Sequence, residues 1–145
     1  MARHPATYRG VVYPWHCDHM GHMNVMWYVG MFDEATWTFF AGFGLSSSFL
    51  RENNRGMAAL EQHLTYHREL LPGDVIEIST NLLEVREKSL RFRHEMKETV
   101  SGQLSATCEL VALHIDTKIR KGTAFSLPIQ EALAAVLPGD HTDQG

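Results

Sequence analysis

The chain has 145 residues, of which 44% are hydrophobic and 21% are charged, with a formal net charge of −4. This length and composition suit one domain with its own apolar core, and they exclude a disordered or collagen-like chain. The acidic balance argues against a nucleic-acid partner, because proteins that bind the phosphate backbone normally carry a basic excess.

The first predicted strand covers residues 7–13 and leads into a polar loop at 15–23. Asn24 is a suitable N-cap for the helix that follows, which apolar residues at helical spacing carry to about Ala41, before Gly42. Because this helix is apolar on nearly every side, we expect it to be buried on most sides and wrapped by a sheet.

The same apolar stretch is not expected to span a membrane. Asp33 and Glu34 lie adjacent in its middle, and a charge at the centre of a spanning helix costs roughly 2.5–3.5 kcal/mol. The first ten residues contain no apolar run of signal-peptide length. We therefore expect Cys17 and Cys108 to be reduced thiols in a cytoplasmic protein.

The second half of the chain predicts a polar loop, four strands in series and a short helix. Alternating apolar and charged residues from Leu90 to Lys97 show the period of two that is typical of a strand. The sheet face opposite the helix is only partly polar, so dimerisation is expected. The sequence therefore predicts an α+β domain over residues 1–137 with a flexible tail at 138–145. The expected elements are the loop at 45–56, strands at 57–68, 75–85, 90–97 and 104–115, and the helix at 128–137.

The polar loop is the first candidate site, because it runs directly into the start of the apolar helix. The first amides of a helix have no partner inside the helix and favour developing negative charge, so a substrate carbonyl placed there would be polarised. Asp18 is the only carboxylate in the loop and could attack that carbonyl or activate water. Alternatively, Asp18 only caps backbone amides of the loop.

Two other chemistries are open at the same loop. His16, His19 and His22 together with Cys17 are ligands that zinc accepts, but no second Cys/His pair follows, so we expect no metal. The Cys17 thiol near a helix start could be a nucleophile, although the adjacent carboxylate of Asp18 opposes thiolate formation.

A second candidate site is the tight connection between the strands at 75–85 and 90–97. Arg86, Lys88 and Ser89 could grip a phosphate there, although an ordinary solvated turn shows the same pattern. His63, in the strand after the long loop, could reach the first site or could simply be a partly buried histidine.

The motif C-D-H-M-G-H-M-N-V-x-W-Y from Cys17 to Tyr28, followed by D-E-A within the helix, resembles the acyl-CoA thioesterases of the hotdog superfamily. The closest type is the 4-hydroxybenzoyl-CoA thioesterase-like branch, to which V-R-E-K-S at Val85–Ser89 is also similar. The resemblance covers residues 7–136 and implies a long central helix wrapped by a five- to six-stranded antiparallel sheet. It also implies a homodimer or dimer of dimers with active sites at the subunit interface, and no cofactor.

The resemblance assigns roles to single residues. Asp18 would be the nucleophile or general base, the Val25 amide would polarise the thioester carbonyl, and Asn24 would order the loop, with His22 in the same catalytic motif. The residues expected to bind the acyl-CoA substrate are Tyr28, Trp15, His63, Arg86, Lys88 and Ser89.

The chain departs from the hydroxybenzoyl enzyme at His19 and His22, so an aromatic substrate is not carried over. The H-M-G-H-M-N stretch is similar to hotdog thioesterases associated with carnitine breakdown, and bulky rings near the loop favour a short acyl group, with betainyl-CoA as a hypothesis. Another hotdog branch carries its carboxylate on the central helix, where Asp33 or Glu34 would be the candidates. The alternative to an enzyme is a non-catalytic acyl-CoA-binding domain.

Overall fold

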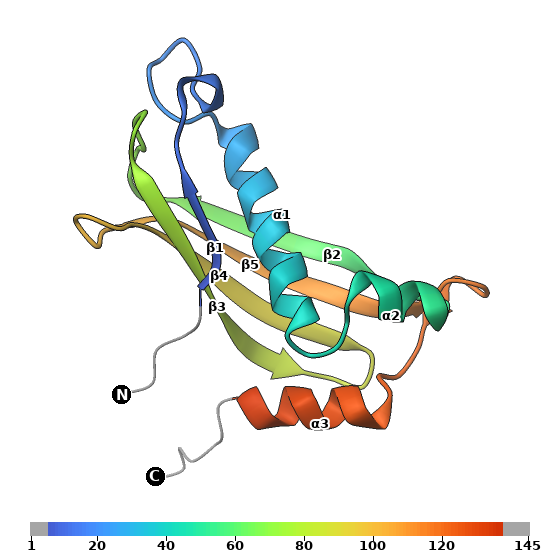
Figure 1. Ribbon diagram of the computed structural model, residues 1–145. Coiled ribbons are helices and arrows are strands. Elements are labelled where there is room, and N and C mark those ends of the chain that lie inside the picture. Colours follow the sequence, from blue (N-terminus) through green and yellow to red (C-terminus); the bar gives the residue numbers. More distant parts are fainter. Residues whose placement is uncertain (1–5, 138–145) are drawn as a thin grey trace, which may run out of the picture. The chain divides into compact units, whose positions relative to one another are not determined.

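The computed structural model describes residues 6–137 and contains one six-stranded sheet, with strand order β1-β3-β4-β5-β2 and β6 paired to β5 (Figure 1). The tail expected at 138–145 lies outside the described residues. The strands are β1 (Ala6–Val11), β2 (Arg55–Tyr66), β3 (Val75–Val85), β4 (Ser89–Glu98), β5 (Leu104–Asp116) and β6 (Lys121–Gly122). The helices are α1 (Val25–Ala41), α2 (Ser47–Glu52) and α3 (Leu127–Val136), together with a 3-10 turn at Pro14–His16.

The chain divides into two compact units. The described part of the first comprises residues 6–39, 63–81 and 93–109. The second comprises residues 40–62, 82–92 and 110–137.

In the first unit, β1 lies antiparallel to β3, with Val11 opposite Val75 and Ala6 opposite Ser79. Figure 1 shows this pair as the blue and yellow-green strands. The strand predicted at 7–13 therefore ends two residues early, because the chain turns into the 3-10 segment at Pro14.

A buried polar chain joins α1 to the sheet of the first unit. The imidazole of His94, which is 0% exposed, has Nε2 2.8 Å from the Thr36 hydroxyl and Nδ1 2.7 Å from the Thr80 hydroxyl. The Thr80 hydroxyl also lies 2.8 Å from that of Thr7. Phe32 stacks on the imidazole with ring centroids 5.6 Å apart. Both ring nitrogens of a fully buried histidine are thus satisfied, which is what allows it to sit in the core.

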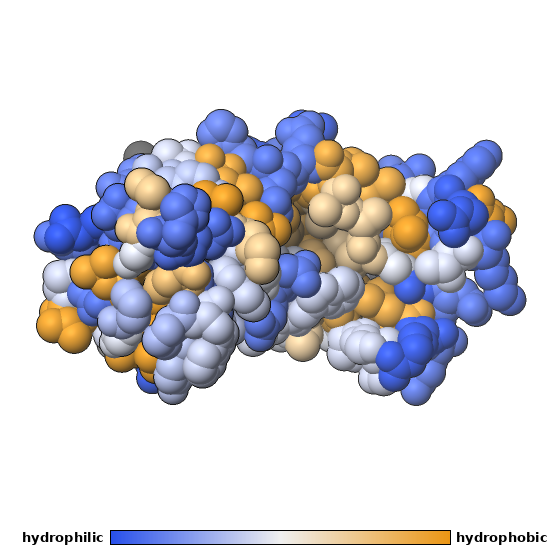
Figure 2. All heavy atoms as spheres, turned by 90° about the horizontal axis from the view of Figure 1, so that it is seen from above, coloured by the Kyte–Doolittle hydropathy of each residue, from blue (hydrophilic) through white to orange (hydrophobic). Residues whose placement is uncertain are grey.

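Burial of α1 differs from the prediction. The residues of α1 that belong to the first unit, 25–39, bury one side of the helix. Four apolar side chains on the other sides are between 39% and 62% exposed: Val25, Met26, Val29 and Trp37. The prediction of burial on most sides is therefore wrong for the single chain, because the core covers only one side of the helix. Figure 2 shows apolar and hydrophilic residues side by side on the face seen from above. No helix among residues 6–137 is both long and apolar enough to cross a membrane.

The second unit contains two elements that the sequence did not predict. The loop expected at 45–56 holds α2, whose N-cap Ser46 accepts a hydrogen bond from the Phe49 amide at 3.2 Å. The short strand β6 pairs with the end of β5, with Gly122 opposite Ile115. The helix predicted at 128–137 is α3, displaced by one residue.

Candidate active site

The polar loop folds back on itself as a tight hairpin in the first unit. Cys17 and Met23 form an isolated antiparallel bridge, and the Asp18 amide donates to the His22 carbonyl at 3.2 Å. The Gly21 amide donates to the Asp18 carbonyl at 3.0 Å and closes the turn between them. Gly21 has φ +90°, a conformation that residues with a side chain rarely adopt. The glycine of the motif therefore sets the geometry of the turn that presents Asp18.

The Asp18 carboxylate is held by two donors. Oδ2 accepts from the Asn24 side-chain amide at 2.8 Å, and Oδ1 accepts from the Met20 backbone amide at 2.9 Å. These bonds, the one from Asn24 above all, hold the pKa of Asp18 below its usual range. The carboxylate is thus ionised and oriented at neutral pH.

The start of α1 lies next to this carboxylate through Asn24. The Asn24 side-chain oxygen accepts from the Met26 amide at 3.0 Å, and its backbone carbonyl accepts from the Trp27 amide at 3.0 Å. Val25 is the first helical residue, so its amide has no acceptor inside the helix, and we find none among the other described residues. The Val25 amide therefore has no hydrogen-bond acceptor among the described residues, and its role toward a ligand stays a prediction.

A cavity of about 310 Å³ adjoins the loop and the start of α1. The buried ring of Tyr28 meets that of Tyr66 edge to face, with centroids 5.1 Å apart and planes at 85°. Burial, and then the neighbouring Tyr66 and Glu69, raises the pKa of Tyr28 to about 12, so its hydroxyl stays neutral. The residues that line the cavity are His22, Met23, Val25, Tyr28, Tyr66, His67, Arg68 and Glu69.

The cavity brings together three of the predicted residues, His22, Val25 and Tyr28, with five that were not predicted, among them Tyr66 and Glu69. Tyr66 and Glu69 carry no motif; a strand of mixed polarity ending near residue 66 was the only available signal.

Of the six predicted substrate-binding residues only Tyr28 lines this cavity, and Trp15 and His63 of the first unit do not. The side chain of Trp15 is 66% exposed and stacks on Tyr13 with centroids 4.5 Å apart. His63 lies exposed on β2. Both stay predictions.

The alternative chemistries of the loop can also be placed. The His16 Nδ1 accepts from the Tyr13 amide at 2.9 Å, while the His22 Nε2 lies 3.3 Å from a Glu69 carboxylate oxygen. Within residues 6–137, no three His, Cys, Asp or Glu side chains converge to hold a metal ion. The Cys17 thiol lies 3.7 Å from the Tyr13 carbonyl. Asp33 and Glu34 are exposed on α1.

The predicted phosphate-binding turn lies in the second unit. Glu84 bridges two cations, with Arg86 Nε at 2.9 Å and Arg91 Nε at 3.3 Å from its two oxygens. Arg86 and Ser89 contribute to a hollow of about 200 Å³, which Lys88 does not line. The complete lining is Glu61, Glu84, Arg86, Ser89, Leu90, Arg91 and Val111.

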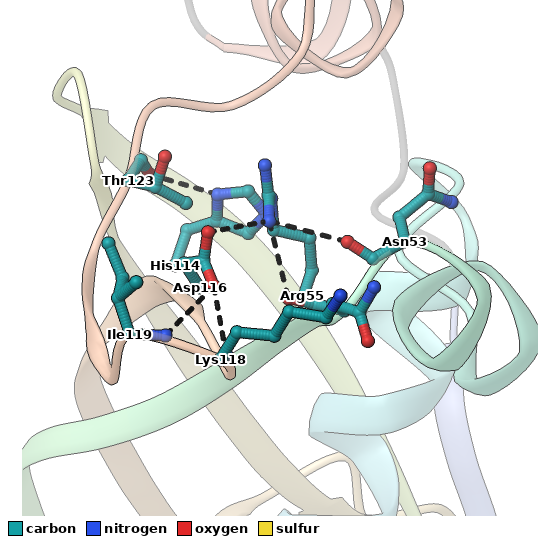
Figure 3. Close-up of polar contacts among 8 residues, drawn as sticks. Asn53, Arg55, His114, Asp116, Lys118, Ile119 and Thr123 are labelled. Atoms are coloured by element: carbon teal, nitrogen blue, oxygen red, sulfur yellow. Dashed lines mark hydrogen bonds and ion pairs between the residues drawn. The ribbon is translucent and has the colours of Figure 1, made fainter.

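The backbone of this turn is fixed by the end of β5 and the segment after β6. The His114 amide donates to the Lys88 carbonyl at 2.8 Å. The His114 ring then donates from Nδ1 to the Thr123 carbonyl at 3.0 Å, since a carbonyl can only accept. Figure 3 shows this ring beside an ion pair at 3.2 Å between Arg55 and Asp116. Burial lowers the pKa of His114, so the imidazole is neutral in this support.

Comparison with known proteins gives consistent matches. The thioesterase-like superfamily model matches residues 12–136. A betainyl-CoA thioesterase from Pseudomonas aeruginosa is 31% identical over 131 residues, which cover 88% of this chain and 82% of that protein. An L-carnitine dehydrogenase/betainyl-CoA thioesterase from Agrobacterium fabrum is 28% identical over 116 residues, and the match covers 80% of this chain but 24% of that protein.

Among solved structures, a Staphylococcus aureus protein in complex with CoA aligns with a TM-score of 0.87 at 23% identity. The alignment covers 96% of this chain and 90% of that one. The similarity confirms the predicted α+β hotdog fold.

Proposed function

The chain belongs to the thioesterase-like superfamily and is an enzyme of the thioesterase class, and from this premise we propose that it hydrolyses a short-chain acyl-CoA, betainyl-CoA in particular, with Asp18 as its catalytic carboxylate. The observation that carries the proposal is the Asn24 side chain, which joins the Asp18 carboxylate to the start of α1. An ionised carboxylate and an unused helix-start amide are thereby held on the same short segment.

In the proposed reaction the Val25 amide donates to the thioester carbonyl oxygen and stabilises the negative charge that develops on it. If Asp18 is the nucleophile, its oxygen bonds to the acyl carbon, the C–S bond breaks and CoA leaves as a thiolate. Water then hydrolyses the mixed anhydride to the free acid. If Asp18 is a general base, it takes a proton from the water that attacks the same carbon, and the C–S bond then breaks to give the free acid and CoA. His22 shapes the turn that carries Asp18, through its carbonyl.

Support for the acyl group comes from the cavity and from the relatives. A volume of about 310 Å³ lies at the low end of ligand cavities, which are roughly 300–1,000 Å³, and suits a short acyl group. Two relatives are betainyl-CoA thioesterases by name. Tyr28 on the cavity wall is the predicted substrate-binding residue that best fits this role.

Support for the CoA part comes from the turn in the second unit. Arg86 and Ser89 line a hollow together with Arg91, so two guanidinium groups face the same space. A structural neighbour was solved with CoA bound. We propose that Arg86, Lys88 and Ser89 contact the CoA phosphates or pantetheine. We also propose that the protein is a homodimer or a dimer of dimers, which light scattering of the purified protein tests. The proposal further includes a single domain over residues 1–137 and a cytoplasmic location.

The test is thiol release from a panel of acyl-CoAs by the wild type and by Asp18→Asn. The variant keeps the size of the side chain, so we expect kcat to fall about a thousandfold or more while substrate binding persists. Asp33→Asn and Glu34→Gln examine the alternative helix carboxylates and should retain most of the activity. Equal rates for wild type and Asp18→Asn would remove Asp18 from the mechanism. Acyl-CoA binding without any thiol release would favour the non-catalytic binding domain.

A further inference from the structure

A cavity wall of two tyrosines and one carboxylate borders the proposed catalytic loop. Tyr28 and Tyr66 come from α1 and the end of β2, and Glu69 from the segment after β2, all within the first unit. From this arrangement we propose that Tyr28, Tyr66 and Glu69 form a specificity site for the cationic end of a quaternary-ammonium acyl group. The inference rests on the proposed function, because it concerns which acyl thioester the same site selects.

The two tyrosine rings offer the surface that a quaternary ammonium prefers. Such a cation has no hydrogen to donate, so it is recognised by the negative faces of aromatic rings and by nearby carboxylates. The planes of Tyr28 and Tyr66 stand at 85° with centroids 5.1 Å apart, so rings of two orientations border one cavity. Tyr28 is 4% exposed and Tyr66 is 47% exposed, which gives one wall in the core and one at the mouth. A cation held in the cavity against these rings would lose part of its hydration, the condition in which cation–π attraction is strongest.

The Glu69 carboxylate supplies the counter-charge. Its negative charge acts on the Tyr28 hydroxyl and contributes to the raised pKa of that group, so the carboxylate and the phenol share one local field.

The other charged groups of the lining leave Glu69 available. Its ion pair among the described residues is with His22 Nε2 at 3.3 Å, and an imidazole carries a full positive charge only when it is protonated. Arg68, which also lines the cavity, interacts electrostatically with Glu98, whose carboxyl pKa it helps to lower. Glu98 itself does not line the cavity.

His22 connects this wall to the catalytic loop. Its ring meets Glu69, and its backbone carbonyl accepts from the Asp18 amide at 3.2 Å. A cationic acyl group held at Glu69 would therefore be fixed against the same hairpin that carries Asp18.

The first experiment compares two acyl groups of the same shape, one cationic and one neutral, so the effect of charge on the rate is separated from the effect of size. Trimethylammonioacetyl-CoA (betainyl-CoA) and 3,3-dimethylbutanoyl-CoA differ only in a quaternary nitrogen against a quaternary carbon. The readout is the ratio of their kcat/KM values. We expect the wild type to favour the cationic thioester, and Glu69→Gln to lower that ratio about threefold through a loss on the cationic thioester, since the Glu69 side chain is exposed. Glu131→Gln, an exposed substitution on α3 with the same change in net charge, should leave the ratio unaltered.

The ring walls are tested by a second pair of variants. Tyr66→Leu removes the π face and should lower the ratio about tenfold, whereas Tyr66→Phe keeps the face and should change it less than about threefold. An equal loss on both thioesters in Glu69→Gln would make Glu69 a support of the hairpin and overturn the inference. A wild type without preference for the cation would overturn it as well, with thioesterase activity intact.

Binding separates a failure of the inference from a failure of the proposed function. Calorimetric titration of Asp18→Asn with both thioesters should show the same preference for the cation in the absence of turnover. If the wild type hydrolyses neither thioester but binds the cationic one more tightly, the proposed activity is wrong and the specificity site stands. Equal binding of both thioesters would overturn the specificity site.

Discussion

The side-chain amide of Asn24 donates to Oδ2 of Asp18 at 2.8 Å. The oxygen of the same amide accepts from the Met26 amide at 3.0 Å. One side chain thus caps α1 and orients the proposed catalytic carboxylate, so the position of Asp18 is coupled to the start of the helix.

Two substitutions of Asn24 separate these duties. Asn24→Asp keeps an oxygen for the Met26 amide, so the cap and the stability should be largely preserved. It also replaces the donor to Asp18 with a second carboxylate, which should raise the pKa of Asp18. The acid limb of kcat/KM against pH should therefore move to higher pH.

Asn24→Ala removes both the helix cap at Met26 and the hydrogen bond to Asp18. We expect it to lower the free energy of unfolding by about 1 kcal/mol and also to move the acid limb to higher pH. Urea denaturation and the pH–rate profile measure the two effects. An unchanged acid limb in Asn24→Asp would show that the ionisation of Asp18 does not limit the rate.

Gly21 provides a second test of the loop. An added Cβ would meet no atom within 4 Å, so Gly21→Ala should be resisted only by its φ of +90°. The left-handed conformation costs a residue with a side chain about 1–2 kcal/mol, so the hairpin should distort and kcat should fall.

Gly30→Ala is the matched control for Gly21→Ala. It also has open space around the added Cβ, but it lies within α1, where alanine should stabilise the protein by about 0.5–1 kcal/mol. Similar kinetics for the two variants would show that the turn does not need glycine.

The helix and the catalytic loop were predictable because their signals are local. Asn24 as an N-cap and glycines after Ala41 mark both ends of α1, and the loop motif brings Asp18 to its start. The helix α2 was missed because its serine-rich start has the composition of a loop, and its cap bond from Phe49 to Ser46 becomes evident only in the folded chain.

The cavity was only half predictable for a different reason. His22, Val25 and Tyr28 belong to one continuous segment, so their proximity follows from the sequence. Tyr66 and Glu69 reach the same cavity because the end of β2 lies against α1 within the first unit, as the contact between the Tyr28 and Tyr66 rings shows. That proximity depends on strand order, which a local pattern does not contain.

Burial of His94 predicts a loss of stability in mild acid. Burial lowers its pKa from 6.5 to about 4. The unfolded chain therefore binds a proton as the pH falls through 6.5, and the folded chain does not until about 4. The contribution of His94 to the free energy of unfolding is therefore complete above pH 6.5. We expect about 3 kcal/mol of this free energy to be lost as the pH falls from 6.5 to about 4.

Chemical denaturation at pH 7 and pH 5 measures this slope. His94→Gln keeps hydrogen-bonding groups near Thr36 and Thr80 but does not titrate, so it should be less stable at pH 7 and show a shallower pH dependence. His63→Gln, an exposed substitution, should keep the wild-type slope. A slope in His94→Gln equal to that of the wild type would assign the acid sensitivity to other groups.

Glu84 forms ion pairs with both Arg86 and Arg91, so substitutions of Glu84 and Arg86 should change the affinity for CoA in opposite directions. Arg86 and Arg91 share the Glu84 carboxylate, so a phosphate that binds there must compete with it. Arg86→Gln should weaken CoA binding about tenfold, whereas Glu84→Gln should remove the competing carboxylate and tighten binding about threefold, the magnitude of an exposed ion pair.

Titration calorimetry with CoA at low and high salt checks both directions, and added salt should reduce both differences because these charges are exposed. Glu87→Gln is the matched control: it removes the same charge from the same turn, but Glu87 does not line the hollow. If Glu87→Gln tightened binding as much as Glu84→Gln, the effect would come from net charge and not from the loss of a carboxylate that competes with the phosphate. Tightening in Glu84→Gln alone would place the CoA phosphates at Arg86 and Arg91.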